Sequence, residues 1–213
     1  GRTASFVRLM GCNLSCTWCD TPYTWDASRH DLRKETTHRG VRELAGELFE
    51  NPGIVVLTGG EPLLHQDRAP FKLLLALLSE LGKQVHVETN GTILPNPHTM
   101  GAVHTLVVSP KLPHAGPHRG RQSPRMAQGW ERRTAWGTVH LKVVVQDAGD
   151  VARAVTIADH YGVPMERLWV MPEGTSAAAL AARWPAIAEA AAYYGANASH
   201  RLHVLAWGDK RGR

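Results

Sequence analysis

The three cysteines of the chain, Cys12, Cys16 and Cys19, lie within a stretch of eight residues, and the chain holds no fourth cysteine. Their C-x3-C-x2-C spacing lets three thiolates converge on one metal centre. Iron–sulfur clusters are usually held by four cysteine thiolates, so a four-iron cluster here would keep one iron without a protein ligand. An open coordination position distinguishes catalytic metal sites from closed structural ones. The spacing therefore favours a cluster that binds a further ligand.

Two other interpretations of the cysteines are a structural zinc site, completed by one of the 12 histidines, and a disulfide with a spare thiol. Zinc sites usually add a second C-x2-C or H-x3-H block, and the sequence contains neither. An odd number of cysteines in a chain of 213 residues is unlike a small secreted disulfide scaffold. Zinc is the stronger of these two alternatives, and the open cluster is favoured over both.

The elements that would position the cysteines alternate between strands and helices. Strands are predicted at 4–9, 54–57, 84–87, 105–108, 139–145, 168–170 and 202–205, and helices at 38–50, 71–81, 149–161 and 176–194, the last interrupted at Pro185. Residues 22–36 and 112–129 are predicted to be loops. Such alternation is typical of a parallel α/β sheet with right-handed crossovers. About seven strands are fewer than the eight of a complete barrel, so we expect a partial, open barrel.

A polar or glycine-rich motif follows each of five predicted strands. These motifs are T-G-G-E-P at 58–62, E-T-N-G at 88–91, S-P-K at 109–111, M-P-E-G at 171–174 and W-G-D at 207–209. Each could be only a turn. Ligands of parallel sheets, however, bind at the carboxyl edge of the strands, where the cysteine loop is also expected. One shared site at that edge explains all the motifs together.

Composition is that of a globular protein, with 43% hydrophobic and 20% charged residues and a net charge of +5. We expect a single domain over residues 1–213, with native residues missing before Gly1. No apolar run is long enough for a membrane span, no signal peptide pattern is present, and free cysteines favour the cytoplasm.

Basic residues gather at 29–39, 114–133 and 210–213. Because no nucleic-acid-binding string accompanies them, we interpret them as solvated surface.

The strings F-V-R-L-M-G-C-N-L at 6–14 and C-D-T at 19–21, with Trp18 as the aromatic residue before the third cysteine, resemble the 7-carboxy-7-deazaguanine synthases of the radical S-adenosylmethionine (SAM) superfamily. The resemblance implies a partial, open (β/α) barrel with a 4Fe-4S cluster on the three cysteines. The reduced cluster would cleave SAM to a 5'-deoxyadenosyl radical that takes hydrogen from C6 of 6-carboxy-5,6,7,8-tetrahydropterin. The ring then contracts, ammonia leaves, SAM is regenerated and 7-carboxy-7-deazaguanine forms, in the pathway of queuosine, a tRNA modification, and other deazapurines.

The same resemblance assigns residues to roles. Arg8 and Thr58 would contact the substrate, Arg8 through its carboxylate, and Thr21 would bind Mg2+. The residues that would bind SAM are Trp18, Cys19, Asp20, Gly60, Glu61, Glu88, Asn90, Ser109, Pro110, Lys111, Met171, Pro172, Glu173 and Gly174. Glu61 would place a negative charge against the SAM ammonium group, and Glu88 and Asn90 would bond the ribose.

Three of these positions also have plain structural interpretations. Thr21 could cap the turn before Pro22, Lys111 could be a surface lysine, and Arg8 an outward strand residue. Two departures from the family pattern concern the ligands. The family often has a more polar residue at the position of Met171, and its Q-G-E-G string before the first strand has no counterpart from Gly1 onward. His203 and the tail after Trp207 would close the pocket.

The resemblance further implies a reducing electron donor such as a flavodoxin and a homodimer, with no direct nucleic-acid partner and no membrane. Two other functions stay open from the cysteine loop alone. One is an activase that makes a glycyl radical on a partner protein, and the other is a zinc-stabilised basic RNA-binding module. The C-D-T string and Arg8 favour a small carboxylated substrate over a protein substrate.

Overall fold

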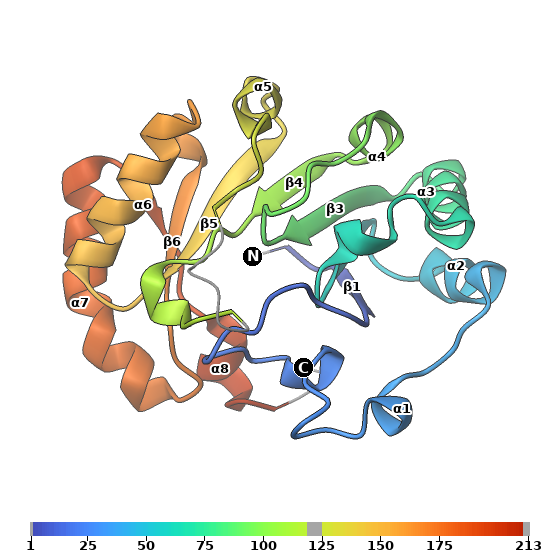
Figure 1. Ribbon diagram of the computed structural model, residues 1–213, viewed down its shortest axis with the longest axis horizontal. Coiled ribbons are helices and arrows are strands. Elements are labelled where there is room, and N and C mark those ends of the chain that lie inside the picture. The colour runs from blue at the N-terminus through green and yellow to red at the C-terminus, as the bar shows by residue number, and fades with distance from the viewer. Residues whose placement is uncertain (1, 119–124, 211–213) are drawn as a thin grey trace.

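Seven parallel strands form one sheet in the computed structural model, which describes residues 2–118 and 125–210 (Figure 1). The strands are β1 (Ser5–Leu9), β2 (Ile54–Gly59), β3 (Gln84–Thr89), β4 (Thr105–Val108), β5 (Val139–Val145), β6 (Leu168–Pro172) and β7 (Asn197–Ala198). Each strand pairs in parallel with the next one along the chain, so β1 and β7 are the two edges. The sheet is therefore open, which confirms the predicted fold class.

Helices surround the outside of the sheet, where Figure 1 shows α2 to α7 as an arc. The α-helices are α1 (Leu32–Glu35), α2 (Val41–Phe49), α3 (Ala69–Glu80), α4 (Pro97–Ala102), α5 (Trp130–Thr134), α6 (Ala148–His160), α7 (Ala177–Tyr194) and α8 (Leu202–Trp207). Short 3-10 turns are η1 (Pro22–Thr24), η2 (Pro62–His65), η3 (Pro113–Ala115) and η4 (Met165–Arg167). In Figure 1, α1 and α8 lie at the open side of the arc.

The two faces of the sheet differ in burial. Residues 54–58 of β2 are all buried, as predicted for a strand covered on both faces. In β3, Val85 and Val87 are fully buried whereas His86 and Glu88 are only partly covered. Because side chains alternate across a strand, the valines join the core under the helices, and the polar residues project from the opposite, concave face. That face leads to the site described below.

The last predicted strand is wrong. Residues 202–207 form helix α8, and the seventh strand is the two-residue β7, which pairs with β6. A short apolar run such as L-H-V-L does not distinguish strand from helix by its pattern. In α8 only Val204 is buried, while Leu202 and Leu205 are exposed. W-G-D at 207–209 therefore follows a helix and is not a strand-end motif.

Smaller differences concern interruptions and loops. Helix α7 runs through Pro185 without a break. Pro185 is exposed, so water can satisfy the carbonyl that loses its amide partner. The region 22–36 contains η1 and α1, and 112–129 contains η3. Residues 119–124 of that long loop lie outside the described part of the chain, as do Gly1 and 211–213 of the basic tail.

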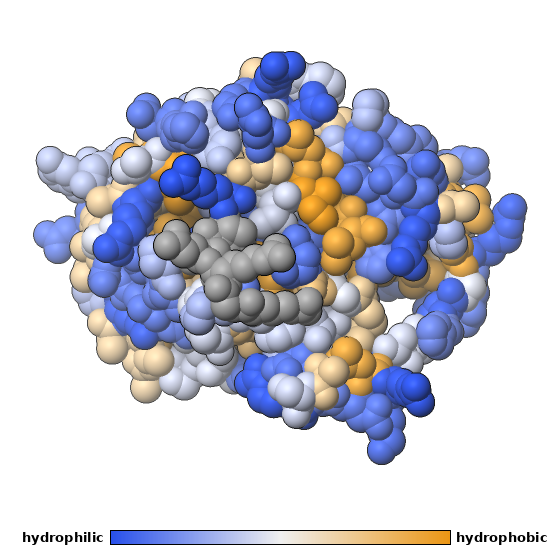
Figure 2. All heavy atoms as spheres, in the orientation of Figure 1, coloured by the Kyte–Doolittle hydropathy of each residue, from blue (hydrophilic) through white to orange (hydrophobic). Residues whose placement is uncertain are grey.

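On the face seen in Figure 2, most visible atoms belong to hydrophilic residues, and a strip of hydrophobic residues runs over the side of β3 and β4. Across the residues that the structure describes, no helix has the length and apolar character that a membrane crossing requires.

Candidate active site

A cavity of about 180 Å³ lies at the carboxyl ends of the strands. Its walls come from the cysteine loop, defined here as residues 11–21, and from the ends of β2 to β6. Four of the five predicted strand-end motifs contribute to it, so the expectation of a shared edge is confirmed for them. The predicted site residues in the lining are Cys12, Cys16, Trp18, Cys19, Asp20, Thr21, Thr58, Gly60, Glu88, Asn90, Ser109, Lys111 and Met171.

Six predicted site residues are not part of this lining: Arg8, Glu61, Pro110, Pro172, Glu173 and Gly174. Pro110 is buried between two residues that do line it. The Glu173 carboxylate pairs with Arg183 and accepts a hydrogen bond from the amide of Gln146 at 3.5 Å. The end of β6 thus presents Met171 to the cavity, and the loop after it uses Glu173 for its own packing.

Backbone contacts hold the cysteine loop against β2. Gly11 has φ of +92°; its amide donates to the Thr24 carbonyl at 2.8 Å, and its carbonyl accepts from the Glu61 amide at 2.8 Å. A Cβ added at Gly60 would collide with the Gly11 carbonyl, and one at Gly59 would collide with the backbone of β1. These glycines are therefore required for the close approach of two backbones, a reason additional to the predicted contact with SAM.

A side-chain network ties the cysteine loop to the end of β3. Asn90 donates from Nδ2 to the Asn13 Oδ1 at 2.9 Å, and Asn13 donates to the Thr92 hydroxyl at 2.7 Å. The Thr92 hydroxyl donates in turn to the Asn90 Oδ1 at 2.6 Å. This closed ring fixes Asn90, so its side chain positions the loop as well as lining the cavity.

All three cysteines are free, with Cys16 buried and the other two partly buried. Burial raises the pKa of Cys12, although the Leu14 amide, which donates to its Sγ at 3.4 Å, acts in the opposite direction. Burial raises the pKa of Cys16 to about 11, against the lowering effect of the Lys111 ammonium group. The thiols of Cys12 and Cys16 are therefore neutral at physiological pH until a metal displaces their protons.

Glu61 is fully buried, and its recorded partners are groups of the protein itself. Its carboxylate accepts hydrogen bonds from the amides of Leu63 at 3.0 Å and Asn90 at 2.7 Å and from the Thr89 hydroxyl at 2.8 Å. Burial is the main reason that its pKa is raised. The structure thus places this carboxylate behind the cavity wall, where it joins the G-G-E-P turn to the E-T-N-G turn.

A charged pair lies in the cavity itself. Lys142 of β5 contacts Glu88 of β3 at 3.2 Å, and the Thr58 hydroxyl donates to the other Glu88 oxygen at 3.0 Å. Burial alone would raise the pKa of Glu88, but the Lys142 ammonium group and these hydrogen bonds lower it below its ordinary value. The positive charge of Arg8 acts in the same direction, which places Arg8 near the pair although its side chain is exposed and lies against Phe6.

Lys111 and Trp18 meet on another wall. The Lys111 ammonium group lies 5.6 Å from the Trp18 ring centroid and donates to the Ser109 hydroxyl at 2.9 Å. Trp18 also stacks on His114. The Trp18 indole N–H is buried without a hydrogen-bond partner among the described residues. A buried donor of this kind is costly, which makes it a position for an acceptor of a bound molecule.

The carboxyl-terminal segment also reaches the site. Arg201, whose side chain is 5% exposed, pairs with Asp20 of the cysteine loop. The pKa of His203 is lowered, mainly by burial and then by the charge of Arg201, with smaller effects of Lys142 and Arg8. These neighbours place the segment beside the charged pair.

Sequence reasoning missed Lys142, Arg201 and Trp25, all of which line the cavity. For Lys142 a signal was available, since a lysine inside the otherwise apolar V-H-L-K-V-V-V strand must project from the concave face. For Arg201 no signal existed, because its partner lies 181 positions away. Trp25 lies in residues 22–36, which the sequence analysis predicts to be a loop and to which it assigns no role in the site.

The donor set fits an iron–sulfur cluster. Three free thiols line one cavity, and cysteine thiolates are the usual ligands of such clusters. Across residues 2–118 and 125–210, no three His, Cys, Asp or Glu side chains are grouped so that they could hold a metal ion. The unpartnered indole N–H of Trp18 beside the thiols provides a further position for a bound group.

Comparisons with known proteins show the family to which the chain belongs. The model of the radical SAM superfamily matches residues 7–102. A 7-carboxy-7-deazaguanine synthase of Pyrobaculum aerophilum is 37% identical over all of this chain and 90% of its own length. Proteins of the same name from Halobacterium salinarum and Bacillus subtilis are 34% and 28% identical, over 98% and 100% of this chain and 84% and 90% of their own lengths.

Among solved structures, SuiB of Streptococcus suis aligns with 94% of this chain at a TM-score of 0.61 and 13% identity, and this chain covers 50% of it. SuiB bound to S-adenosylmethionine aligns at a TM-score of 0.60 and 16% identity, over 92% of this chain and 46% of its own. The chain thus spans about half the length of SuiB. At this identity the likeness shows the fold alone.

Proposed function

The chain belongs to the 7-carboxy-7-deazaguanine synthases, a family of radical SAM enzymes, and on that premise we propose that its cavity converts 6-carboxy-5,6,7,8-tetrahydropterin to 7-carboxy-7-deazaguanine with release of ammonia. The observation that carries the proposal is the meeting of three free cysteines with Lys111, Glu88 and Lys142 in one cavity. Family membership disfavours the activase and the zinc module, and neither is supported by a specific feature of the site.

Cys12, Cys16 and Cys19 would hold a 4Fe-4S cluster as thiolates. When bound together, the cluster and SAM supply the radical chemistry. The protein's part is to deliver three thiolates from one loop, and that loop is fixed by the Gly11 backbone contacts and by the Asn13–Asn90 network. Two N–H donors, the Leu14 amide and the Trp25 indole, already point at sulfur atoms of this set.

For SAM, the wall formed by Trp18 and Lys111 offers a cation and an unused N–H donor, which suit the carboxylate of an amino acid. Gly60, Asn90, Ser109, Met171 and Asp20 complete this part of the lining. Glu61, Pro110, Pro172, Glu173 and Gly174 lie behind the lining, and we propose that they shape the loops. In particular, Glu61 would act by fixing the Asn90 amide rather than by touching the SAM ammonium group.

For the pterin, Arg8 would bind the carboxylate as a planar bidentate donor, and Thr58 would contact the ring while it holds Glu88. Thr21 lines the cavity, and its hydroxyl, whose one contact among the described residues is a long 3.7 Å to the Cys19 sulfur, would take one position of a Mg2+ ion whose other ligands are substrate oxygens and water. The ribose contact predicted for Glu88 stays a prediction, because in the structure its carboxylate is engaged by Lys142 and Thr58. The flavodoxin-type donor, the homodimer and the cytoplasmic location stay predictions as well.

An anaerobic assay tests the function. Purified protein, reconstituted with iron and sulfide, is incubated with dithionite, SAM and the carboxypterin, and the product is identified by mass spectrometry. We expect 7-carboxy-7-deazaguanine and ammonia in equal amounts, with SAM not consumed. Protein that holds the cluster and cleaves SAM without ever converting the pterin would contradict the substrate assignment. Colourless protein with one zinc ion per chain would contradict the cluster.

A further inference from the structure

Trp25 is the one residue among the described part of the chain whose side-chain N–H is recorded as a donor to a cysteine sulfur. Its indole Nε1 donates to the Cys19 Sγ at 3.4 Å. An indole nitrogen is a donor only, so the sulfur is the acceptor. Trp25 lines the cavity and is half-buried, which shields the bond from part of the competing water.

A short turn that also anchors the cysteine loop holds this indole in place. Trp25 ends η1, and its backbone amide donates to the Pro22 carbonyl at 3.0 Å. The preceding residue, Thr24, is 1% exposed, and its carbonyl accepts from the amide of Gly11, which opens the cysteine loop. The hydroxyl of Thr24 donates to the Thr21 carbonyl at 2.8 Å. The turn is therefore anchored at both ends of the cysteine loop, and Trp25 is held against its third cysteine.

The three sulfur atoms differ in their surroundings. Cys12 accepts from a backbone amide, that of Leu14, which any sequence would supply at that position. Cys16 lies among Leu14 and Ala115 in a small apolar cluster. Cys19 has the Trp25 indole at 3.4 Å and the Thr21 hydroxyl at a longer 3.7 Å. Only the Cys19 environment thus depends on side-chain donors, and the indole is the nearer of the two.

We propose that Trp25 is a positioning residue that tunes the cluster through Cys19, by donating a hydrogen bond to the thiolate and so raising the reduction potential of the cluster. This inference rests on the proposed function, because it requires a cluster on the three cysteines. The added electron makes the cluster more negative, and a donor at a ligand sulfur stabilises that negative charge more in the reduced than in the oxidised state. Hydrogen bonds to the sulfurs are among the established determinants of such potentials.

The test is a one-electron redox titration of the reconstituted protein without SAM, followed by electron paramagnetic resonance. Trp25→Phe keeps an aromatic ring and removes the N–H. We expect the equilibrium constant for reduction to fall between threefold and tenfold, where tenfold corresponds to about 59 mV for one electron. Trp136→Phe is the matched control, because Trp136 is 53% exposed and its indole has no role in the proposal; its potential should equal that of the parent protein.

A second measurement reads the bond itself. Pulsed electron paramagnetic resonance of the reduced protein in D2O should show exchangeable deuterons near the cluster. Their signal should decrease by the contribution of one deuteron in Trp25→Phe and stay unchanged in Trp136→Phe, while the deuteron of the Leu14 amide beside Cys12 remains in both. If Trp25→Phe does not fold or take up iron, 3-benzothienylalanine at position 25 preserves the bicyclic shape without the N–H. An unchanged potential in the variant that retains its cluster, or a deuteron signal as strong as that of the parent protein, would overturn the inference.

Failure of this inference and failure of the proposed function give different results. A parent protein that binds no cluster overturns both. A parent protein with a cluster, whose potential falls on Trp25→Phe but which never converts the pterin, upholds the role of Trp25 and overturns only the substrate. A fully active Trp25→Phe variant with an unchanged potential overturns only the role of Trp25.

Discussion

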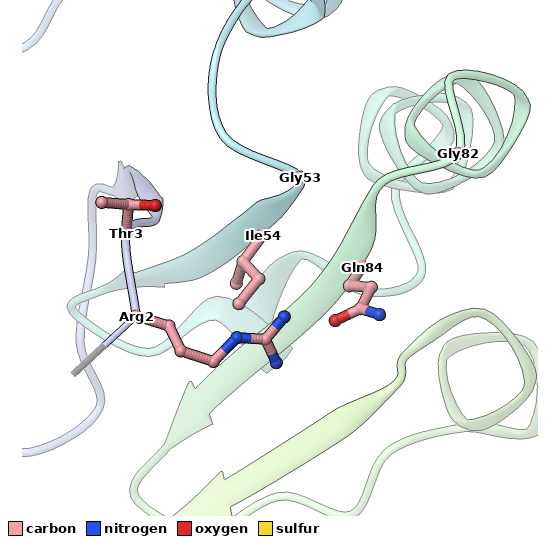
Figure 3. Close-up of a pocket in the computed structure, with 6 residues that line it drawn as sticks. All are labelled: Arg2, Thr3, Gly53, Ile54, Gly82 and Gln84. Carbon is pink, nitrogen blue, oxygen red and sulfur yellow. The ribbon is translucent and has the colours of Figure 1, made fainter.

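The two ends of the sheet each carry a hollow, and the two hollows differ in the residues that line them. The amino-end hollow is lined by Arg2, Thr3, Gly53, Ile54, Gly82 and Gln84, with the Arg2 side chain reaching across it toward Gln84 (Figure 3). The carboxyl-end cavity contains the three thiols and the charged pair. The side chains that could perform chemistry are thus concentrated at the carboxyl end.

The cations at the two ends of the sheet have different partners. Lys83, near the amino end, is 7% exposed and donates to the carbonyls of Phe49 and Asn51 at the end of α2. Arg167 likewise donates to carbonyls of the segment before β5, including Thr134 at 2.9 Å. At the carboxyl end, Lys142 faces Glu88 in an open cavity. The amino-end cations thus donate hydrogen bonds to backbone carbonyls, whereas the Lys142–Glu88 pair at the carboxyl end lies where a ligand can reach it.

Replacing Cys16 by Ala should have the largest effect, because a cluster left with two thiolates is labile. We expect loss of bound iron and of all turnover, measured by iron and sulfide analysis and by product formation, with an unchanged far-ultraviolet circular dichroism spectrum. Full activity in this variant would refute the assignment of the chemistry to the carboxyl-end cavity, because the enzyme would then work without its three thiols.

Lys142→Met tests whether the charged pair serves catalysis. The change removes the cation that lowers the pKa of Glu88, so that pKa rises and the acid limb of the pH–rate profile should move to higher pH. Turnover should fall about tenfold to a hundredfold because the substrate is misplaced. Lys142→Arg keeps the charge and should recover part of the rate. A pH profile that coincides with that of the parent would mean that the pair is structural, like the amino-end cations.

Thr21→Val tests whether Mg2+ binding and radical generation depend on different residues of the cavity. The variant keeps the β-branched shape and removes the hydroxyl proposed for Mg2+. Product formation should respond less to added Mg2+, by about tenfold in the concentration needed, while SAM cleavage survives. A titration with Mg2+ that matches the parent would remove Thr21 from the ligand set.

Lys83→Met addresses the amino end. The carbonyls of Phe49 and Asn51 would lose a charged donor, so the free energy of unfolding should drop by about 1–3 kcal/mol, as measured by urea denaturation. Activity per bound cluster should not change. Lys34→Met is the control, because the Lys34 side chain is 85% exposed and its loss should cost little. Reduced turnover per cluster in Lys83→Met would mean that the amino end also contributes to function and is not purely structural.

Gln84→Ala should have the smallest effect. Gln84 lines the amino-end hollow and is exposed at the start of β3, and its removal should change neither turnover nor the Michaelis constant for the pterin beyond experimental error. A selective rise in that constant, measured in the anaerobic assay, would show that the amino-end hollow contributes to ligand binding after all.

Local patterns were enough to predict most of the scaffold. Strands β4 and β5 have the predicted bounds, and α2, α3 and α6 begin within three residues of theirs, because β-branched runs and helical periodicity act within a few residues. Residues 202–207 failed because a short run with one buried residue has no decisive period. Only the contacts with the rest of the fold determine that conformation.

The site was predictable where chemistry lies in adjacent residues. The cysteine loop and the G-G-E-P and E-T-N-G turns were located in this way. What the sequence could not reveal is which atoms those residues use on one another. The Glu61 carboxylate accepts a hydrogen bond from the Leu63 amide in the adjacent turn. The Trp25 indole reaches the sulfur of Cys19, six positions earlier, only because η1 folds onto the cysteine loop. Such pairings depend on tertiary distances that no local pattern contains.

The ion pair between Asp20 and Arg201 has a consequence for biosynthesis. It joins positions 181 residues apart, so the cysteine loop receives this anchor only after Arg201 has left the ribosome. Until then the thiols belong to a nascent chain without this anchor and are open to oxygen. Loading with iron and sulfide is therefore expected to follow the emergence of Arg201.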